Sequence, residues 1–270
     1  MELFERSFTT ALADLFLPRL CCVCGTELGR NERHVCIGCL AGMPLTLSWT
    51  LRRNPMAERF NALIERNGRP DMPGSGDSVP AGDVPEAAEG VDSCGRYVDA
   101  VALFNFVKDG GYRNITYRLK YGRDIGEGRF FSSMLGERAA LAPWFADVDT
   151  VVPVPLHWTR RLRRGYNQAE VIARGVAGAL GAEVRTDLLV RTRRTSTQTR
   201  LGIAEKARNV SGAFAVPDRA SRDVSLRGIR HLLLVDDVFT TGSTLYNCYL
   251  PLRRFLGPDV RIGIATLGAV

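Results

Sequence analysis

The stretch from Leu232 to Thr244 limits the possible folds and functions more than any other part of the chain. It opens with four apolar residues, a run whose short length and abrupt polar end favour a buried strand over a helix. Two neighbouring carboxylates, Asp236 and Asp237, come next, and a helix pattern begins at about Leu245. Between the acids and the helix lies a loop of small residues: Thr240, Thr241, Gly242, Ser243 and Thr244. The stretch therefore predicts a strand, an acidic pair, a small-residue loop and a helix.

This order of residues suits a phosphorylated sugar. A small-residue loop at the start of a helix presents backbone N–H groups in the positive field of the helix dipole, and glycine lets a phosphate come close. Asp236 and Asp237 would repel a phosphate, but they can accept hydrogen bonds from neighbouring sugar hydroxyls. A nucleoside triphosphatase is disfavoured because no lysine follows Gly242. The ordinary alternative is a strand-to-helix turn in which Asp and Thr only cap the helix.

The composition is that of a globular protein with a basic surface. The chain has 270 residues, 45% of them hydrophobic and 24% charged, with a net charge of +7. A basic surface suits polyanions such as pyrophosphate or nucleic acid, although a solvated arginine-rich surface explains the charge equally well. No stretch approaches the roughly 18 apolar residues of a membrane span. Acidic residues interrupt the N-terminus and argue against a secretory signal, so we predict a cytoplasmic protein with reduced cysteines.

Four of the seven cysteines form two Cys-x2-Cys pairs: Cys21, Cys24, Cys36 and Cys39. Four thiolates make a closed tetrahedral site, which predicts a structural zinc ion. Zinc binding contributes roughly 10–16 kcal/mol in small modules, enough to fold a segment this short. An iron–sulfur cluster and unligated thiols are the alternatives. His34 is a weaker candidate ligand, and Cys22 is left over.

Composition also divides the chain into three parts. Residues 1–50 contain an amphipathic helix pattern and the cysteine pairs. Residues 51–95 are predicted to form an acidic, Gly/Pro-rich, disordered insertion. In residues 96–270, strand patterns at 98–106, 150–157 and 261–267 alternate with helix patterns, which predicts an α/β domain with a mainly parallel sheet flanked by helices.

Ligands of such sheets bind beyond the carboxyl ends of the strands. Arginines at 160, 161, 163 and 164 follow the strand pattern of residues 150–157. We therefore expect them to share one crevice with the stretch at 236–244 and to contact phosphate oxygens, which arginine binds well. Residues 191–209 are also basic and polar, and they fit either a segment that closes on phosphates or a surface loop.

Residues 235–244 resemble the motif that binds phosphoribosyl pyrophosphate (PRPP) in type I phosphoribosyltransferases. Other parts of the chain are similar to the ComF/GntX-like family of competence proteins. They are the paired cysteines, Leu119-Lys120-Tyr121, the run from Val152 to His157 and the run from Arg163 to Gln168. The resemblance implies a type I phosphoribosyltransferase-like parallel sheet flanked by helices, with a small N-terminal four-cysteine zinc module.

The resemblance also implies roles for individual residues. Asp236 and Asp237 would be the catalytic acids that hold the ribose hydroxyls, and residues 240–244 would hold the 5′-phosphate. Pyrophosphate, with magnesium, would lie against residues beyond Pro153: Val154, Pro155, His157, Arg160, Arg163 and Arg164. The family is linked to DNA uptake in natural competence and to helicase-type partners.

Two hypotheses of function remain at this stage. The first is an enzyme that transfers phosphoribose from PRPP to an unknown nitrogen acceptor. The second is a non-catalytic adaptor that binds a nucleotide or single-stranded DNA and recruits a helicase-type partner. Few aromatic residues lie between the arginines, so the sequence gives only a weak signal for base stacking.

Overall fold

The computed structural model describes residues 18–67, 97–107, 110–122, 124–192, 212–223, 226 and 228–270. Within them, five parallel strands form the central sheet in the order β1-β7-β6-β2-β3. The strands are β1 (Ala100–Asn105), β2 (Thr150–Pro153), β3 (Glu183–Val184), β6 (His231–Phe239) and β7 (Arg261–Ala269). A separate antiparallel pair joins β4 (Val190–Arg191) to β5 (Phe214–Ala215). The predicted α/β fold with a parallel sheet is confirmed.

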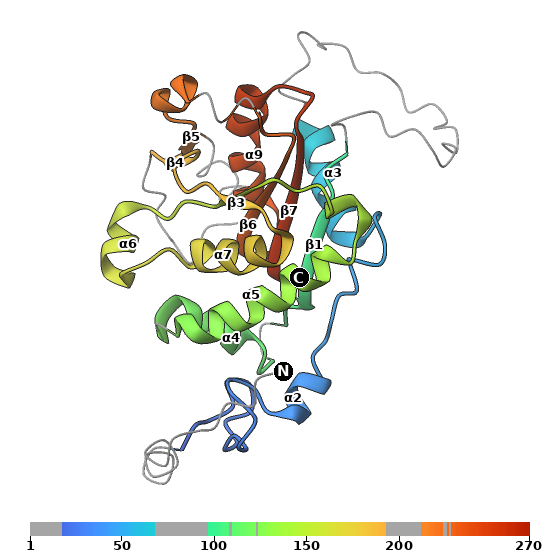
Figure 1. Ribbon diagram of the computed structural model, residues 1–270, viewed down its shortest axis with the longest axis vertical. Coiled ribbons are helices and arrows are strands. Elements are labelled where there is room, and N and C mark those ends of the chain that lie inside the picture. Colours follow the sequence, from blue (N-terminus) through green and yellow to red (C-terminus); the bar gives the residue numbers. More distant parts are fainter. Residues whose placement is uncertain are drawn as a thin grey trace.

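Helices cover both faces of the sheet (Figure 1). Helices α5 (Ile125–Ala140) and α7 (Gln168–Leu180) pack on one face, and α3 (Pro55–Asn67) and α9 (Ser243–Leu256) pack on the other. The remaining helical segments are α2 (Ile37–Ala41), α4 (Arg113–Tyr117), a π-helix (Arg118–Gly122), α6 (Trp158–Arg164) and short 3-10 turns at Pro143–Phe145 and Asp218–Arg222. None of the described helices is long and apolar enough to cross a membrane.

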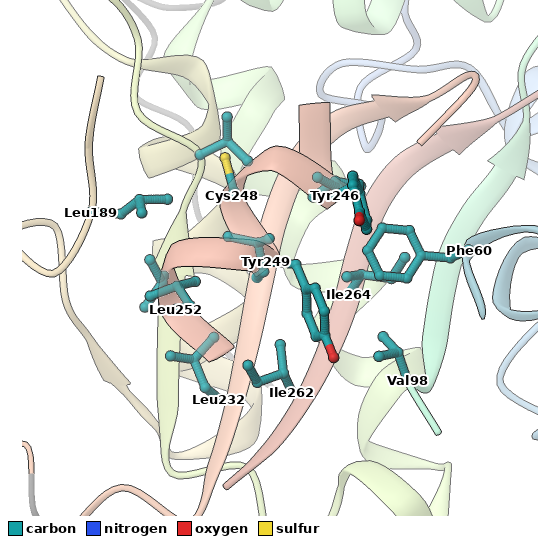
Figure 2. Packing of buried hydrophobic residues seen from close by; sticks show 14 of the residues in the cluster. Phe60, Val98, Leu189, Leu232, Tyr246, Cys248, Tyr249, Leu252, Ile262 and Ile264 are labelled. Atoms are coloured by element: carbon teal, nitrogen blue, oxygen red, sulfur yellow. The ribbon is translucent and has the colours of Figure 1, made fainter. Parts of the chain in front are cut away.

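Strand β6 shows why the sheet needs both layers. Its side chains alternate, so Leu232 and Leu234 join the core beneath α3 and α9, while Leu233 and Val235 join the core beneath α5 and α7. All four residues are fully buried. Figure 2 shows the first of these cores, in which Phe60 lies beside Tyr246 and Tyr249 of α9. A continuous apolar run is what a parallel strand covered on both faces requires.

Strand β6 is longer than predicted. The sequence pattern ended this strand at Val235, before the acids, but β6 continues to Phe239. The neighbouring strand β7 also continues, and it pairs with Asp236 and Val238 through Thr266 and Gly268. The correction is that both acids lie inside the strand, because a partner strand can extend a ladder beyond the apolar run.

The predicted disorder of residues 51–95 is wrong for the part of that range that the structure describes. Residues 55–67 form α3, and its buried side chains Met56, Phe60 and Ile64 recur every four residues. That spacing puts them on one helix face, which packs on the sheet. The rest of the predicted insertion lies outside the described residues, as do the helix pattern at 1–17 and most of the basic stretch at 191–209.

The other strand patterns have counterparts in the structure. Strand β2 is shorter than the pattern at 150–157: it ends at Pro153, although the backbone N–H of Val154 still donates to the carbonyl of Val235 at 2.8 Å. Pro155 then has no N–H group to continue a ladder. Helix α7 begins at Asn167, whose side chain accepts a hydrogen bond from the backbone N–H of Ala169, and it ends at Gly181 in the left-handed conformation. The strand patterns at 98–106 and 261–267 correspond to β1 and β7.

The segment after the cysteines covers the outer edge of β1. Leu45 forms an antiparallel bridge with Phe104, and the backbone N–H of Thr46 donates to the carbonyl of Leu103. The hydroxyl of Ser48 bonds to both the N–H and the carbonyl of Ala102, at 2.9 and 3.1 Å. Backbone groups on the outer side of β1 are therefore paired within the same chain.

Candidate functional site

The topology creates a crevice between β2 and β6. The chain leaves β2 through α7 and returns as β3, on one side, and it leaves β6 through α9 and returns as β7, on the other. The two helices also lie on opposite faces of the sheet. Neighbouring parallel strands whose connections diverge in this way leave a crevice beyond their carboxyl ends, where ligands of α/β sheets bind.

A cavity of about 280 Å³ occupies this position. Its wall contains two acidic and four basic side chains, drawn from five separate parts of the chain. The residues that line it are Lys120, Tyr121, Val154, Pro155, Leu156, Arg160, Arg164, Gln168, Arg191, Asp236, Asp237 and Thr244. The structure thus brings the acidic pair and two of the predicted arginines to one cavity.

Asp236 and Asp237 border the cavity from opposite faces of β6, because neighbouring side chains in a strand alternate. The Nζ of Lys120 lies 2.6 Å from the Oδ2 of Asp237, which is buried. The backbone N–H of Asp237 donates to the Oδ1 of Asp236 at 2.9 Å. Burial, followed by the charge of Asp237, raises the pKa of Asp236 to about 7. The two carboxylates therefore differ: one is paired with a lysine, and the other takes up a proton near neutral pH.

The loop at 240–244 forms a second, smaller hollow that adjoins the cavity. Asp236 and Thr244 line both spaces. Gly242 precedes the 14-residue helix α9 with a φ of 75°, in the left-handed region that glycine enters without strain. The hydroxyls of Thr241 and Ser243 lie 2.9 Å apart. All five predicted loop residues line this hollow, at the N-terminus of a helix, where backbone N–H groups favour an anion.

Helix α3 supports this loop from below. Arg59 donates from Nη2 to the carbonyl of Thr240 at 2.7 Å, and its guanidinium lies 5.5 Å from the centre of the Phe239 ring. A Cβ atom placed on Gly242 would lie 3.0 Å from Phe239 and 3.4 Å from Phe60. The loop therefore rests on the helix that the sequence did not predict.

The residues beyond Pro153 divide into two groups. Val154, Pro155, Arg160 and Arg164 line the cavity as expected. His157 and Arg163 are not among the described residues that line it. His157 is buried and caps α6, with its Nδ1 2.9 Å from the hydroxyl of Thr159, and Arg163 is exposed on α6. The helix turns every 3.6 residues, so only arginines four apart, at 160 and 164, face the cavity together.

Five lining residues were not predicted as site residues: Lys120, Tyr121, Leu156, Gln168 and Arg191. Lys120 and Tyr121 belong to a π-helix, a form that is often found at functional sites. Burial, and then the charge of Arg160, lower the pKa of Arg191, so this guanidinium favours a negative partner in the cavity. The signal for Lys120 was its place in the Leu-Lys-Tyr run, but no pattern in the sequence connected Arg191 to the crevice.

The four predicted cysteine ligands converge. The sulfur atoms of Cys21, Cys24, Cys36 and Cys39 all lie within 4.8 Å of one another. The sulfurs of Cys24 and Cys36 are 3.8 Å apart, which agrees with the roughly 3.8 Å expected between thiolates bound to one tetrahedral zinc ion. The backbone N–H groups of Cys36 and Cys39 donate to the sulfurs of Cys21 and Cys36, each at 3.4 Å. This donor set fits a structural metal ion.

Neighbouring groups shift the thiols of the cluster in opposite directions, and burial raises the pKa of the Cys39 thiol. Hydrogen bonding to Thr26 lowers the pKa of the Cys24 thiol to about 6, which favours the thiolate that a metal needs. Cys22 is buried in the core, burial raises the pKa of its thiol, and it is not part of the cluster. His34 packs against Phe130, with ring centres 5.7 Å apart, and is not in the cluster either. The four cysteines thus form a set that needs no further protein ligand.

The cysteine segment also supports the element that carries Lys120. The hydroxyl of Tyr112 donates to the carbonyl of Cys39 at 2.8 Å, just before α4 and the π-helix. Cys22 and Val35 share one apolar core with Ile115 and Leu119. In Figure 1 this segment and α2 lie below α4 and α5. A metal bound there would stabilise the segment that packs against α4 and the π-helix, which carries Lys120.

The fold and the crevice define an α/β protein with acidic and basic side chains at the carboxyl ends of its parallel strands. Comparison with known proteins supports a ComF-like family. The chain is 36% identical over 97 residues to the DNA utilization protein YhgH of Escherichia coli K12, and 31% identical over 114 residues to Competence protein F of Haemophilus influenzae. These alignments cover 36% and 42% of this chain, and 40% and 48% of the relatives, so the chain matches less than half of each relative's length. No family model matches the chain.

Proposed function

We propose that the crevice binds PRPP or a related phosphoribosyl ligand. The observation that carries this proposal is the continuity of three surfaces: the loop at 240–244, the carboxylates of β6 and the cationic wall of the cavity. The loop would hold the 5′-phosphate with backbone N–H groups. Asp236 and Asp237 would accept hydrogen bonds from the 2′ and 3′ hydroxyls. Arg160 and Arg164 would bind pyrophosphate on the far side of the sugar.

We further propose that the chain transfers the phosphoribosyl group. A nitrogen nucleophile would form a bond to C1′ of the ribose while the bond from C1′ to the pyrophosphate oxygen breaks, and pyrophosphate would leave with the electron pair. Positive charge would develop on the sugar, as in other glycosyl transfers. The carboxylates would stabilise that charge, and the arginines would stabilise the leaving group.

Magnesium fits this arrangement as a companion of the ligand. The carboxylate of Asp236 is an oxygen donor of the kind that magnesium prefers, and pyrophosphate oxygens and water would supply the other ligands. When bound, the ion would neutralise the charge on pyrophosphate. Lys120 would hold Asp237 in place through the ion pair already present, at 2.6 Å.

A second candidate is a non-catalytic adaptor that binds a nucleotide or single-stranded DNA. The relatives named for DNA utilization and for competence favour a DNA-related role, which we propose for the cytoplasm. As an adaptor, the protein would bind a phosphoribosyl ligand in the crevice without catalysing a reaction, and its partner would be a helicase-type protein. Release of pyrophosphate in the presence of candidate nitrogen acceptors distinguishes the enzyme from the adaptor.

Calorimetric titration with PRPP, with and without magnesium, tests the binding that both candidates share. Hydrogen bonds to charged groups contribute about 1.5–3 kcal/mol each, so Asp236→Asn and Asp237→Asn should each weaken PRPP binding by about ten- to a hundredfold. Glu137→Gln is the matched control, because Glu137 is exposed on α5 and does not line the cavity. Equal affinities of the two Asn variants and the wild type for PRPP would exclude the ribose assignment.

A further inference from the structure

Two exposed tyrosines lie side by side, and one of them, Tyr121, lines the cavity. Tyr117 ends α4 and Tyr121 lies in the π-helix, and their side chains are 59% and 55% exposed. Their ring centres are 4.8 Å apart, at an angle of 47°. The two rings contact each other, and more than half of each residue remains exposed, so a flat ligand can add to this aromatic pair.

Tyr121 connects this pair to the cavity. It lines the cavity next to Lys120, and the guanidinium of Arg164 lies 5.1 Å from the centre of its ring. Gln168 holds Arg164 in this position by accepting a hydrogen bond from its Nη1 at 2.8 Å. In Figure 1, α4 and α6, which carry Tyr117 and Arg164, lie on the same side of the molecule. A cation and two aromatic rings therefore form one shelf, made of Tyr117, Tyr121 and Arg164.

Arg164 adds an unsatisfied polar group beside the tyrosines. Its Nε atom is buried and has no hydrogen-bond partner among the described residues. A buried N–H group without a partner costs free energy. A ligand that presents a flat π-face to the tyrosines and an acceptor atom to a shifted Arg164 would remove that cost, and the other N–H groups of the same guanidinium would remain for pyrophosphate.

A nucleobase has both properties. It offers a flat ring for stacking, and its edge carries carbonyl and ring-nitrogen acceptors. Free phosphate or pyrophosphate would use the arginine but not the exposed tyrosine faces, and an apolar peptide would not need the cation. We infer that the shelf of Tyr117, Tyr121 and Arg164 binds a nucleobase beside the sugar pocket. This inference rests on the proposed function, since the sugar and phosphate of the same ligand would occupy the crevice.

The nucleobase has two possible sources, a free nucleotide and single-stranded DNA. Binding of three probes is measured by calorimetry: ribose 5-phosphate, adenosine 5′-monophosphate and a short oligodeoxyadenylate. The variants are Tyr121→Leu and Tyr117→Leu, which keep an apolar side chain but remove the aromatic face. Trp158→Leu is the control, because Trp158 is also exposed, at 65%, yet does not line the cavity.

Tyr117→Leu and Tyr121→Leu should each weaken the two base-containing probes by about tenfold, and Tyr117→Leu, which changes a residue that does not line the cavity, should leave ribose 5-phosphate binding unchanged. A loss confined to the mononucleotide assigns the shelf to a free nucleotide, and a loss confined to the oligomer assigns it to single-stranded DNA. Unchanged affinities for both base-containing probes in Tyr121→Leu overturn the inference, as does equal weakening in Trp158→Leu. If the wild type does not bind ribose 5-phosphate, the proposed sugar site fails, while the two other probes still report on the shelf.

Discussion

Replacement of Gly242 by alanine tests the geometry of the loop at 240–244. Gly242 has a φ of 75°, and an alanine in that left-handed conformation costs about 1–2 kcal/mol. The new Cβ would also lie 3.0 and 3.1 Å from two atoms of the Phe239 ring. That ring has little room to move, because Phe60 and Arg59 pack against it. Crowding of this kind costs about 1–3 kcal/mol.

The structure offers a matched control in Gly181. It ends α7 with a φ of 69°, but a Cβ placed there would meet no atom within 4 Å among the described residues. Gly181→Ala should therefore lose only the cost of the left-handed conformation, about 1–2 kcal/mol of the free energy of unfolding. Gly242→Ala should lose about 2–5 kcal/mol in total. Urea denaturation followed by circular dichroism measures both free energies of unfolding.

Binding provides a second measurement on the same pair of variants. Relief of the contact with Phe239 would shift the loop and redirect its N–H groups, so Gly242→Ala should also weaken ribose 5-phosphate binding, while Gly181→Ala should not. If the two variants lose the same free energy of unfolding and bind ribose 5-phosphate equally well, the reasoning about the crowded loop is refuted.

Two further predictions concern protons and metal. Because the pKa of Asp236 rises from 3.8 to about 7 on folding, the native state holds this proton more tightly, and the free energy of unfolding should fall as pH rises from about 4 to about 7. The Asp236→Asn variant should lack that decline, so its free energy of unfolding relative to the wild type should increase between pH 4 and pH 8 in urea titrations. A difference between the two proteins that stays constant with pH would contradict the raised pKa of Asp236. Cys24→Ser should lose the bound metal in elemental analysis and loosen the N-terminal segment, whereas Cys22→Ala should keep the metal, and equal metal content in all three proteins would refute the ligand set.

The parts of the fold that the sequence predicted are those that local chemistry decides. Leu232 to Val235 are apolar on both faces, so a doubly covered parallel strand was the natural interpretation. Asn167 and Gly181 mark the two ends of α7 with residues that favour those positions. The cysteine spacing predicted the convergence of four sulfurs, since two Cys-x2-Cys pairs commonly supply the four ligands of one metal ion.

The parts that the sequence did not predict depend on distant neighbours. Helix α3 is polar on average, and only the four-residue spacing of Met56, Phe60 and Ile64 reveals its buried face. The extension of β6 beyond Val235 depends on its pairing with β7. Arg191 reaches the cavity through the antiparallel pair of β4 and β5, which a two-residue strand pattern is too short to indicate.

The candidate site was predicted more completely at the loop and the acids than at the tyrosines. The loop and the acids are contiguous in the sequence, so their chemistry was visible at once. Tyr117 and Tyr121 are four residues apart on consecutive helical turns, but Arg164 meets Tyr121 only when α6 packs beside the π-helix. The weak signal for base stacking in the sequence reflects this distance along the chain.

The way in which residues 45–48 run along β1 determines how the protein can be dissected. A fragment that begins at Tyr97 would keep every strand of the sheet and most of the crevice, yet it would leave the outer amides and carbonyls of β1 open to a strand from another molecule. Such a truncation would also remove Arg59 and Phe60, which pack against the loop at 240–244. The part of the chain before Tyr97 therefore protects the sheet against self-association. We expect a protein shortened to residue 97 to aggregate, which would prevent measurements of ligand binding.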